Sequence, residues 1–195
     1  DAVFITDTGS TDKTCEIIEK VCKRHQKPLK LTKVTPESHP HIWLKEASER
    51  DYSELFPYID SKLNTLEKYN AWLKENGGIF DFSAARQFNL ETIETNWAIW
   101  VDADDYIEGE VPVKKVVEKA ESQFGVGINL IYNYKINAEK KSVETYHYKL
   151  RIFKPSAYRW TPKAPIHENL FLIKEGGREL TADMITINHT KTDWD

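Results

Sequence analysis

The sequence predicts an α/β fold with a mostly parallel central sheet and helices on its faces. An apolar strand, a helix and a second strand follow one another within the first 35 residues, which is the order of a βαβ unit. The continuous apolar segment WAIWV at 97–101 is typical of a strand buried on both faces, as parallel strands are. Apolar residues also recur at helical spacing between the strands, so helices are expected to cover the sheet. The chain has 195 residues, enough for one domain with a substantial core.

The N-terminal segment is expected to supply the βαβ unit. Residues 2–6, AVFIT, predict a short buried strand, and GSTDKT then begins a helix. We expect Ser10 or Thr11 to cap this helix, with Asp12 placed favourably for the helix dipole. Residues 29–35, LKLTKVT, alternate in polarity and predict the second strand. The apolar stripe of the helix consists of Cys15, Ile18, Val21 and Cys22.

Composition excludes several classes of protein. The net charge of -4 is mild and no basic stripe stands out, which argues against a nucleic-acid partner. No apolar stretch is long enough for a transmembrane segment, and no secretory signal is recognisable. Cys15 and Cys22 share a helix face but sit roughly 10 Å apart along its axis, too far for a disulfide. Two reduced thiols favour a cytoplasmic location.

The segment at about 37–78 breaks the strand–helix rhythm and predicts a helical insertion. It begins with the loop-like sequence PESHPH, and Gly77 and Gly78 are expected to end its helix. The residues that recur at helical spacing are Ile59, Leu63, Leu66, Tyr69 and Leu73. This stripe would pack against the rest of the domain, contact an acceptor or form a dimer contact.

The remaining elements follow in order. DFSAARQFNLETI at 81–93 predicts a helix, 97–101 a strand, and 112–123 another helix. Residues 126–136 and 144–154 alternate polar and aromatic side chains, which predicts a hairpin with one open face. LFLI and MITIN predict the last strands.

The most unusual local feature is the acid cluster DADD, which follows WAIWV directly. On an extended strand Asp102 and Asp104 would face together, while Asp105 turns away or begins the loop. Two carboxylates 4–5 Å apart repel each other by roughly 3–4 kcal/mol at an effective dielectric near 20. A shared proton, a cation such as Arg, or a divalent metal would relieve this repulsion. Mg²⁺ and Mn²⁺ take oxygen ligands, often one or two carboxylates plus substrate phosphates. A solvated acidic turn or a helix cap is the alternative.

Five segments together resemble family 2 glycosyltransferases, especially bacterial and phage members with DTGSTD, DFSAARN, DADE and VHE segments. The segments are AVFITDTGSTDKT, DFSAARQFNLE, WAIWVDADDYI, YKLRIFK and PIHENL, and they occur in the family's order. The resemblance covers most of the chain apart from residues 36–78. It implies a GT-A fold, in which a nucleotide-binding βαβ half joins an acceptor-binding half, as a single domain over 1–195. Family members have an earlier first strand, so we expect this chain to be a fragment that lacks it.

The resemblance also implies roles for individual residues. Those expected to bind the donor nucleotide are Asp7, Thr8, Asp81, Arg86, Asp102 and Ala103. Those expected to bind the metal, Mn²⁺ or Mg²⁺, are Asp102, Asp104 and His189. Glu168 is the expected general base, with His167 beside it. The sequence departs from the family at Gln87, where an Asn is usual; Asn89 stands two residues later.

Taken together, these features predict an inverting, metal-dependent glycosyltransferase. The expected donor is a nucleotide sugar, a UDP-sugar by family resemblance, and the acceptor is a peptide, glycan, lipid or polymer. Two alternatives stay open. A sugar-phosphate nucleotidyltransferase uses acids at a strand end in a similar way. A catalytically inactive module that binds nucleotide sugars would keep the same motifs without turnover.

Overall fold

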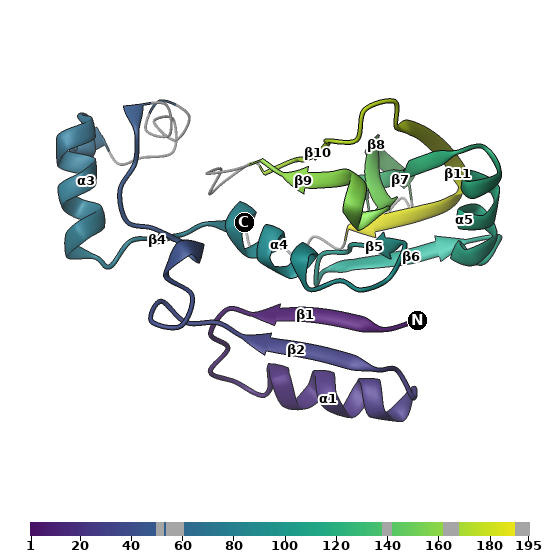
Figure 1. Ribbon diagram of the computed structural model, residues 1–195, viewed down its shortest axis with the longest axis horizontal. Coiled ribbons are helices and arrows are strands. Elements are labelled where there is room, and N and C mark those ends of the chain that lie inside the picture. The colour runs from purple at the N-terminus through teal and green to yellow at the C-terminus, as the bar shows by residue number, and fades with distance from the viewer. Residues whose placement is uncertain (50–52, 54–60, 138–141, 162–167, 190–195) are drawn as a thin grey trace. The chain divides into compact units, whose positions relative to one another are not determined.

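The computed structural model divides the chain into two compact units, each made of two sequence segments (Figure 1). The first unit comprises Asp1–Ile93 and Arg159–Phe171, and the second comprises Glu94–Tyr158 and Leu172–Asp195. The residues that the structure describes are 1–49, 53, 61–137, 142–161 and 168–189.

The first unit begins with the predicted βαβ unit. Strands β1 (Val3–Asp7) and β2 (Leu29–Lys33) pair in parallel, and helix α1 (Thr14–Arg24) connects them. Both cysteines are buried and free, which confirms the prediction of reduced thiols. The predicted cap of α1 is wrong. Ser10 donates its backbone N–H to Asp7, and the Asp12 carboxylate accepts the Thr14 N–H at 2.9 Å, so α1 begins later than expected.

The inserted segment contains short elements around one helix. Strands β3 (Trp43–Leu44) and β4 (Ile79–Phe80) pair antiparallel, and helix α3 spans Leu66–Glu75. The 3₁₀ turns η1 (Pro40–Ile42) and η3 (Ser61–Leu63) complete its described elements. The small core of this segment consists of Leu44, Ala47, Tyr69 and Leu73. The helix is shorter than predicted, and Ile59 lies outside the described residues.

Thr65 caps the first turn of α3, because its side chain accepts the Lys68 N–H. Gly78 N donates to the Leu73 carbonyl at 2.8 Å, and both Gly77 and Gly78 have positive φ, as glycines at helix ends commonly do.

The first unit also contains helix α4 (Phe82–Glu91), which confirms the helix predicted at DFSAARQFNLETI. The Asp81 side chain accepts the Ala84 N–H at 2.9 Å and so caps this helix. Strands β9 (Tyr158–Trp160) and β10 (Leu170–Leu172) pair as a separate two-stranded sheet.

The second unit is built on a five-stranded sheet with the order β5-β8-β7-β11-β6. The predicted hairpin is confirmed as β7 (Gly125–Asn137) and β8 (Ser142–Phe153), and the predicted helix as α5 (Val113–Ser122). The remaining strands are β5 (Ala98–Ile99), β6 (Asp105–Gly109) and β11 (Arg178–His189), and η4 spans Pro155–Ala157. The core under this sheet consists of Val116, Ala120, Ile128, Leu130, Tyr132, Ile152, Ile185 and Ile187.

This sheet corrects the predicted fold class. The GT-A fold with a mostly parallel central sheet is wrong, because the described strands form small two-stranded sheets and one curled five-stranded sheet. Three of its four neighbouring pairs are antiparallel, and only β7–β11 is parallel. The long hairpin organises the sheet, since its two outer edges accept β5 and β11. The WAIWV strand shrinks to two residues, and Ile99 is exposed rather than buried on both faces.

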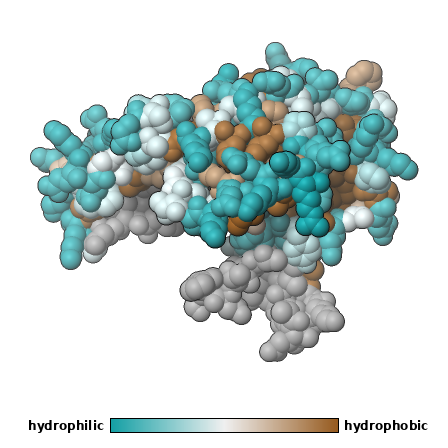
Figure 2. Space-filling model, turned by 90° about the horizontal axis from the view of Figure 1, so that it is seen from below, coloured by the Kyte–Doolittle hydropathy of each residue, from teal (hydrophilic) through white to brown (hydrophobic). Residues whose placement is uncertain are grey.

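Among the described residues, none of the helices combines the length and apolar character that crossing a lipid bilayer requires. On the described part of the face shown in Figure 2, hydrophilic residues alternate with patches of apolar residues.

Candidate metal centre

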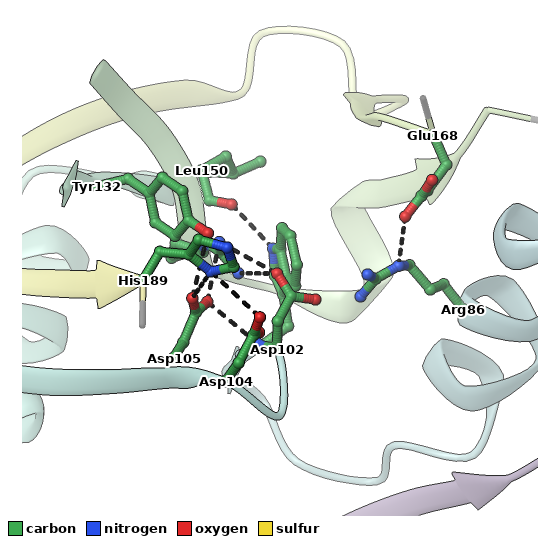
Figure 3. Close-up of polar contacts among 10 residues, drawn as sticks. Arg86, Asp102, Asp104, Asp105, Tyr132, Leu150, Glu168 and His189 are labelled. Atoms are coloured by element: carbon green, nitrogen blue, oxygen red, sulfur yellow. Dashed lines mark hydrogen bonds and ion pairs between the residues drawn. The ribbon is translucent and has the colours of Figure 1, made fainter. Parts of the chain in front are cut away.

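A turn after β5 brings the three acids of DADD together in the second unit (Figure 3). The Asp105 N–H donates to the Asp102 carbonyl at 3.1 Å, and the Asp102 N–H donates to the Asp105 carboxylate at 3.2 Å. These two bonds close the turn around Ala103 and Asp104. Strand β6 then starts at Asp105 and pairs antiparallel with β11, where His189 stands directly opposite Asp105. The strand register therefore places an imidazole beside the acid cluster.

Asp104, Asp105 and His189 form a group whose ligand atoms lie close enough together to hold a metal ion. One ligand atom from each lies within 4.8 Å of the other two. His189 Nδ1 is 3.1 Å from Asp105 Oδ1 and 3.5 Å from Asp104 Oδ2. The Asp105 side chain is 0% exposed and that of His189 is 17% exposed, whereas the Asp104 side chain is 51% exposed. The group is thus closed on the Asp105 side and open to solvent at Asp104.

Asp105 is held by further contacts from the hairpin. The Tyr132 hydroxyl donates to Asp105 Oδ1 at 3.1 Å, and Arg151 Nη2 lies 3.2 Å from Asp105 Oδ2. Burial raises the pKa of the Tyr132 hydroxyl, and the nearby Asp105 carboxylate raises it further. Tyr132 therefore stays protonated and remains a hydrogen-bond donor to this carboxylate at neutral pH.

The charge and chemistry of the group fit a divalent cation. Three carboxylates and the Arg151 guanidinium leave a formal charge of -2, counting His189 as neutral. One Mn²⁺ or Mg²⁺ would balance this charge. Two carboxylate oxygens and an imidazole nitrogen are ligands that Mn²⁺ accepts readily, while Mg²⁺ prefers oxygen alone.

The metal residues differ in part from those predicted. Asp104 and His189 do meet, but Asp102 lies outside the group and contacts Arg151 at 3.4 Å. Asp105 takes the place of Asp102 in the group, although its side chain was predicted to point away from the other two acids. The prediction required an extended strand through DADD, whereas β5 ends at Ile99 and a turn at Ala103 and Asp104 separates it from β6.

The residues predicted to contact the donor nucleotide are distributed over both units. Asp7 and Asp81 are buried in the first unit, and each carboxylate binds a backbone N–H of the turn that follows it. Burial opposes the charged form of Asp7, but hydrogen bonds, chiefly from Ser10, outweigh it and lower the Asp7 pKa. Thr8 and Ala103 are exposed.

Arg86 and Glu168, predicted independently, form an ion pair in the first unit. Arg86 Nε donates to Glu168 Oε1 at 2.7 Å, and the Glu168 side chain is only 15% exposed. The Arg86 guanidinium also lies 5.2 Å from the centroid of the Trp160 ring. His167 lies outside the described residues.

Gln87 and Asn89 each connect helix α4 to a strand. Gln87 Oε1 accepts the Trp160 backbone N–H at 3.0 Å, so it ties α4 to β9. Asn89 donates to the Thr6 hydroxyl at 3.0 Å and ties α4 to β1.

Sequence reasoning missed three residues of the site: Asp105 as a ligand, and Tyr132 and Arg151 as its partners. A signal for Arg151 was present, because this cation stands within the apolar stretch LRIF of a predicted strand. A cation inside an apolar strand needs an anionic partner, and the DADD segment contains three carboxylates that could pair with it.

Comparison with known proteins adds no assignment, since neither a protein-family model nor a curated protein sequence matches the chain.

Proposed function

We propose that the chain is a metal-dependent, inverting glycosyltransferase that uses a nucleotide-sugar donor, specifically a UDP-sugar. The observation that carries this proposal is the convergence of Asp104 and Asp105 with His189, from segments 84 residues apart, into one donor group. The five motifs that resemble family 2 glycosyltransferases support the choice of reaction, because one of them contributes both aspartates.

The roles at the acid cluster follow from its chemistry. Asp104 and Asp105 would each provide a carboxylate oxygen, and His189 a ring nitrogen, to hold Mn²⁺ or Mg²⁺. When bound, the cation would supply positive charge to the donor diphosphate and to the departing nucleoside diphosphate. Tyr132 and Arg151 would keep Asp105 oriented, since both bind its carboxylate.

Glu168 is the proposed general base. The acceptor hydroxyl oxygen would attack the anomeric carbon, and the bond from that carbon to the diphosphate would break. The hydroxyl proton would pass to Glu168. Arg86 binds Oε1 of this carboxylate and so fixes its orientation, and the proton would pass to Oε2. The leaving group departs as the nucleoside diphosphate.

Calorimetric titration with UDP, with Mn²⁺ or with EDTA, tests the donor site. We expect wild-type protein to bind UDP at least about tenfold more tightly with Mn²⁺, and Asp104→Asn to lose this gain. Glu110→Gln is the matched control, because Glu110 is an exposed acid of the same unit, and it should behave like wild type. Equal UDP affinity with Mn²⁺ and with EDTA in wild-type protein would contradict the proposal.

The reaction is tested by screening nucleotide sugars for hydrolysis or transfer by mass spectrometry. We expect Glu168→Gln to keep UDP binding while transfer falls by about 10²-fold or more, the scale of general-base catalysis. Glu75→Gln, an exposed acid of the same unit, should leave turnover unchanged. Release of pyrophosphate would instead indicate a nucleotidyltransferase. Metal-dependent UDP binding without any turnover would indicate an inactive binding module.

A further inference from the structure

Arg151 is the largest fully buried side chain in the described part of the chain. It is 0% exposed, and its guanidinium lies 3.7 Å from the centroid of the Trp100 ring and 4.4 Å from that of the Tyr132 ring. Its Nε has no hydrogen-bond partner among the described residues. A buried cation is costly unless it is paired, so Arg151 depends on the acids that it contacts.

These contacts connect Arg151 to both ends of the DADD turn. Its Nη1 lies 3.4 Å from Asp102 Oδ2, and its Nη2 lies 3.2 Å from Asp105 Oδ2. Asp105 belongs to the candidate metal centre, whereas Asp102 does not. The guanidinium therefore bridges one carboxylate of the centre to a carboxylate outside it, from a position that water does not reach.

The same cation changes the charge that a bound ion would meet. Without Arg151 the cluster would carry a formal charge of -3, which matches a trivalent ion. With Arg151 it carries -2. Because Arg151 is buried, solvent does not screen its charge as it screens a surface lysine.

We propose that Arg151 is a positioning residue that holds Asp105 in place for metal binding and sets the cluster charge so that one divalent cation is preferred over a trivalent one. This inference rests on the metal centre of the proposed function, but it does not depend on the sugar transfer. The charge of Arg151 affects the selectivity between divalent and trivalent ions. Its contacts with both Asp102 and Asp105 affect the affinity for the metal ion, because they hold Asp105 in place.

The test compares Mn²⁺ with Tb³⁺, used as metal ions alone on the full 195-residue chain. Mn²⁺ affinity is measured by calorimetry, and Tb³⁺ affinity by its luminescence, which nearby tryptophans such as Trp100 sensitise. The readout is the ratio of the two affinities. A misplaced ligand weakens both ions, whereas a changed cluster charge alters their ratio, so the ratio separates charge from packing.

Three variants give distinct expectations. Arg151→Met should raise the ratio of Tb³⁺ affinity to Mn²⁺ affinity about a hundredfold. The guanidinium charge, roughly 6 Å from the ion, repels Tb³⁺ more strongly than Mn²⁺ because Tb³⁺ carries one more unit of charge, and the variant removes this repulsion. Arg151→Lys keeps the charge but cannot bridge both acids, so Mn²⁺ affinity should fall about tenfold with the ratio within about threefold of wild type. Lys149→Met is the control, because Lys149 contacts the same Tyr132 ring from a partly exposed position. Its ratio should change less than about fivefold.

An unchanged ratio in Arg151→Met, or an equal ratio shift in Arg151→Met and Arg151→Lys, would overturn the assignment of charge selection. Wild-type Mn²⁺ affinity in Arg151→Lys would overturn the positioning role. If Arg151→Met does not fold, Asp102→Asn tests the charge instead. It removes one negative charge from a partly exposed position and should lower the ratio at least about tenfold. An unchanged ratio there would refute control by cluster charge.

The failure of the metal centre itself would look different. In that case wild-type protein would bind neither ion, or Asp104→Asn would bind both as wild type does. A failed sugar transfer with normal metal binding would leave the role of Arg151 intact.

Discussion

Replacing Asp105 by Asn should destabilise the protein even when no metal is present. The carboxylate is fully buried and lies 3.2 Å from Arg151, an interaction of about 5 kcal/mol at an effective dielectric near 20. Relief of repulsion between the acids and the lower desolvation cost of a neutral amide offset part of this loss. Arg151 also retains Asp102. We therefore expect the free energy of unfolding to fall by about 2–3 kcal/mol, slightly below the usual cost of breaking a buried pair.

The matched variant is Asp104→Asn. Asp104 is half exposed and lies 3.5 Å from His189, so its loss should change the unfolding free energy by less than about 0.5 kcal/mol. Urea unfolding in EDTA, followed by tryptophan fluorescence, measures both variants. Mn²⁺ at 100 times its dissociation constant should then stabilise wild type by about 2.7 kcal/mol and neither variant by a comparable amount. Equal stabilities of the two variants in EDTA would refute the reasoning that Arg151 depends on Asp105.

Three further predictions concern residues outside the metal centre. Asp7→Asn should destabilise the protein by about 1 kcal/mol at neutral pH, and because its folded pKa lies below the ordinary 3.8, this difference should disappear as urea titrations go to lower pH. If the stability difference between wild type and Asp7→Asn stayed constant down to the pH at which the protein unfolds in acid, this prediction would be contradicted. Asp81→Ala should cost about 1 kcal/mol in the same assay through loss of the α4 cap, whereas Asp81→Asn should not; equal losses would argue against the cap. Gly127→Ala should lower the melting temperature clearly, because a Cβ there would collide with the Tyr158 hydroxyl; an unchanged value would show that Tyr158 can move.

The elements with local signals were predictable. The apolar periodicity of 112–123 and the DFSAAR segment gave helices close to α5 and α4, and the alternating strands gave the β7/β8 hairpin. In each case the information lies within one helix or one hairpin, where neighbours in the sequence are neighbours in space. The βαβ unit at the N-terminus was predictable for the same reason.

The arrangement of the sheets was not predictable in this way. WAIWV reads as a buried central strand, yet only Ala98 and Ile99 pair, and they pair antiparallel with β8. The partner residues, Phe153 and Ile152, lie 55 and 53 residues further along the sequence. An apolar run carries no information about which long strand will offer a free edge.

By itself, the sequence determined the helices, the hairpin, the reduced cysteines and an acid cluster that needs a positive partner. The tertiary structure alone decided which acids meet which partners. The strand register of β6 and β11 places Asp105, rather than Asp102, beside His189. The burial of Arg151 places its guanidinium against both Asp102 and Asp105, so this cation pairs with one acid inside the metal group and one outside it. The physical reason is that charge repulsion acts wherever acids are clustered, whereas its relief depends on distances of a few ångströms between strands that are far apart in the chain.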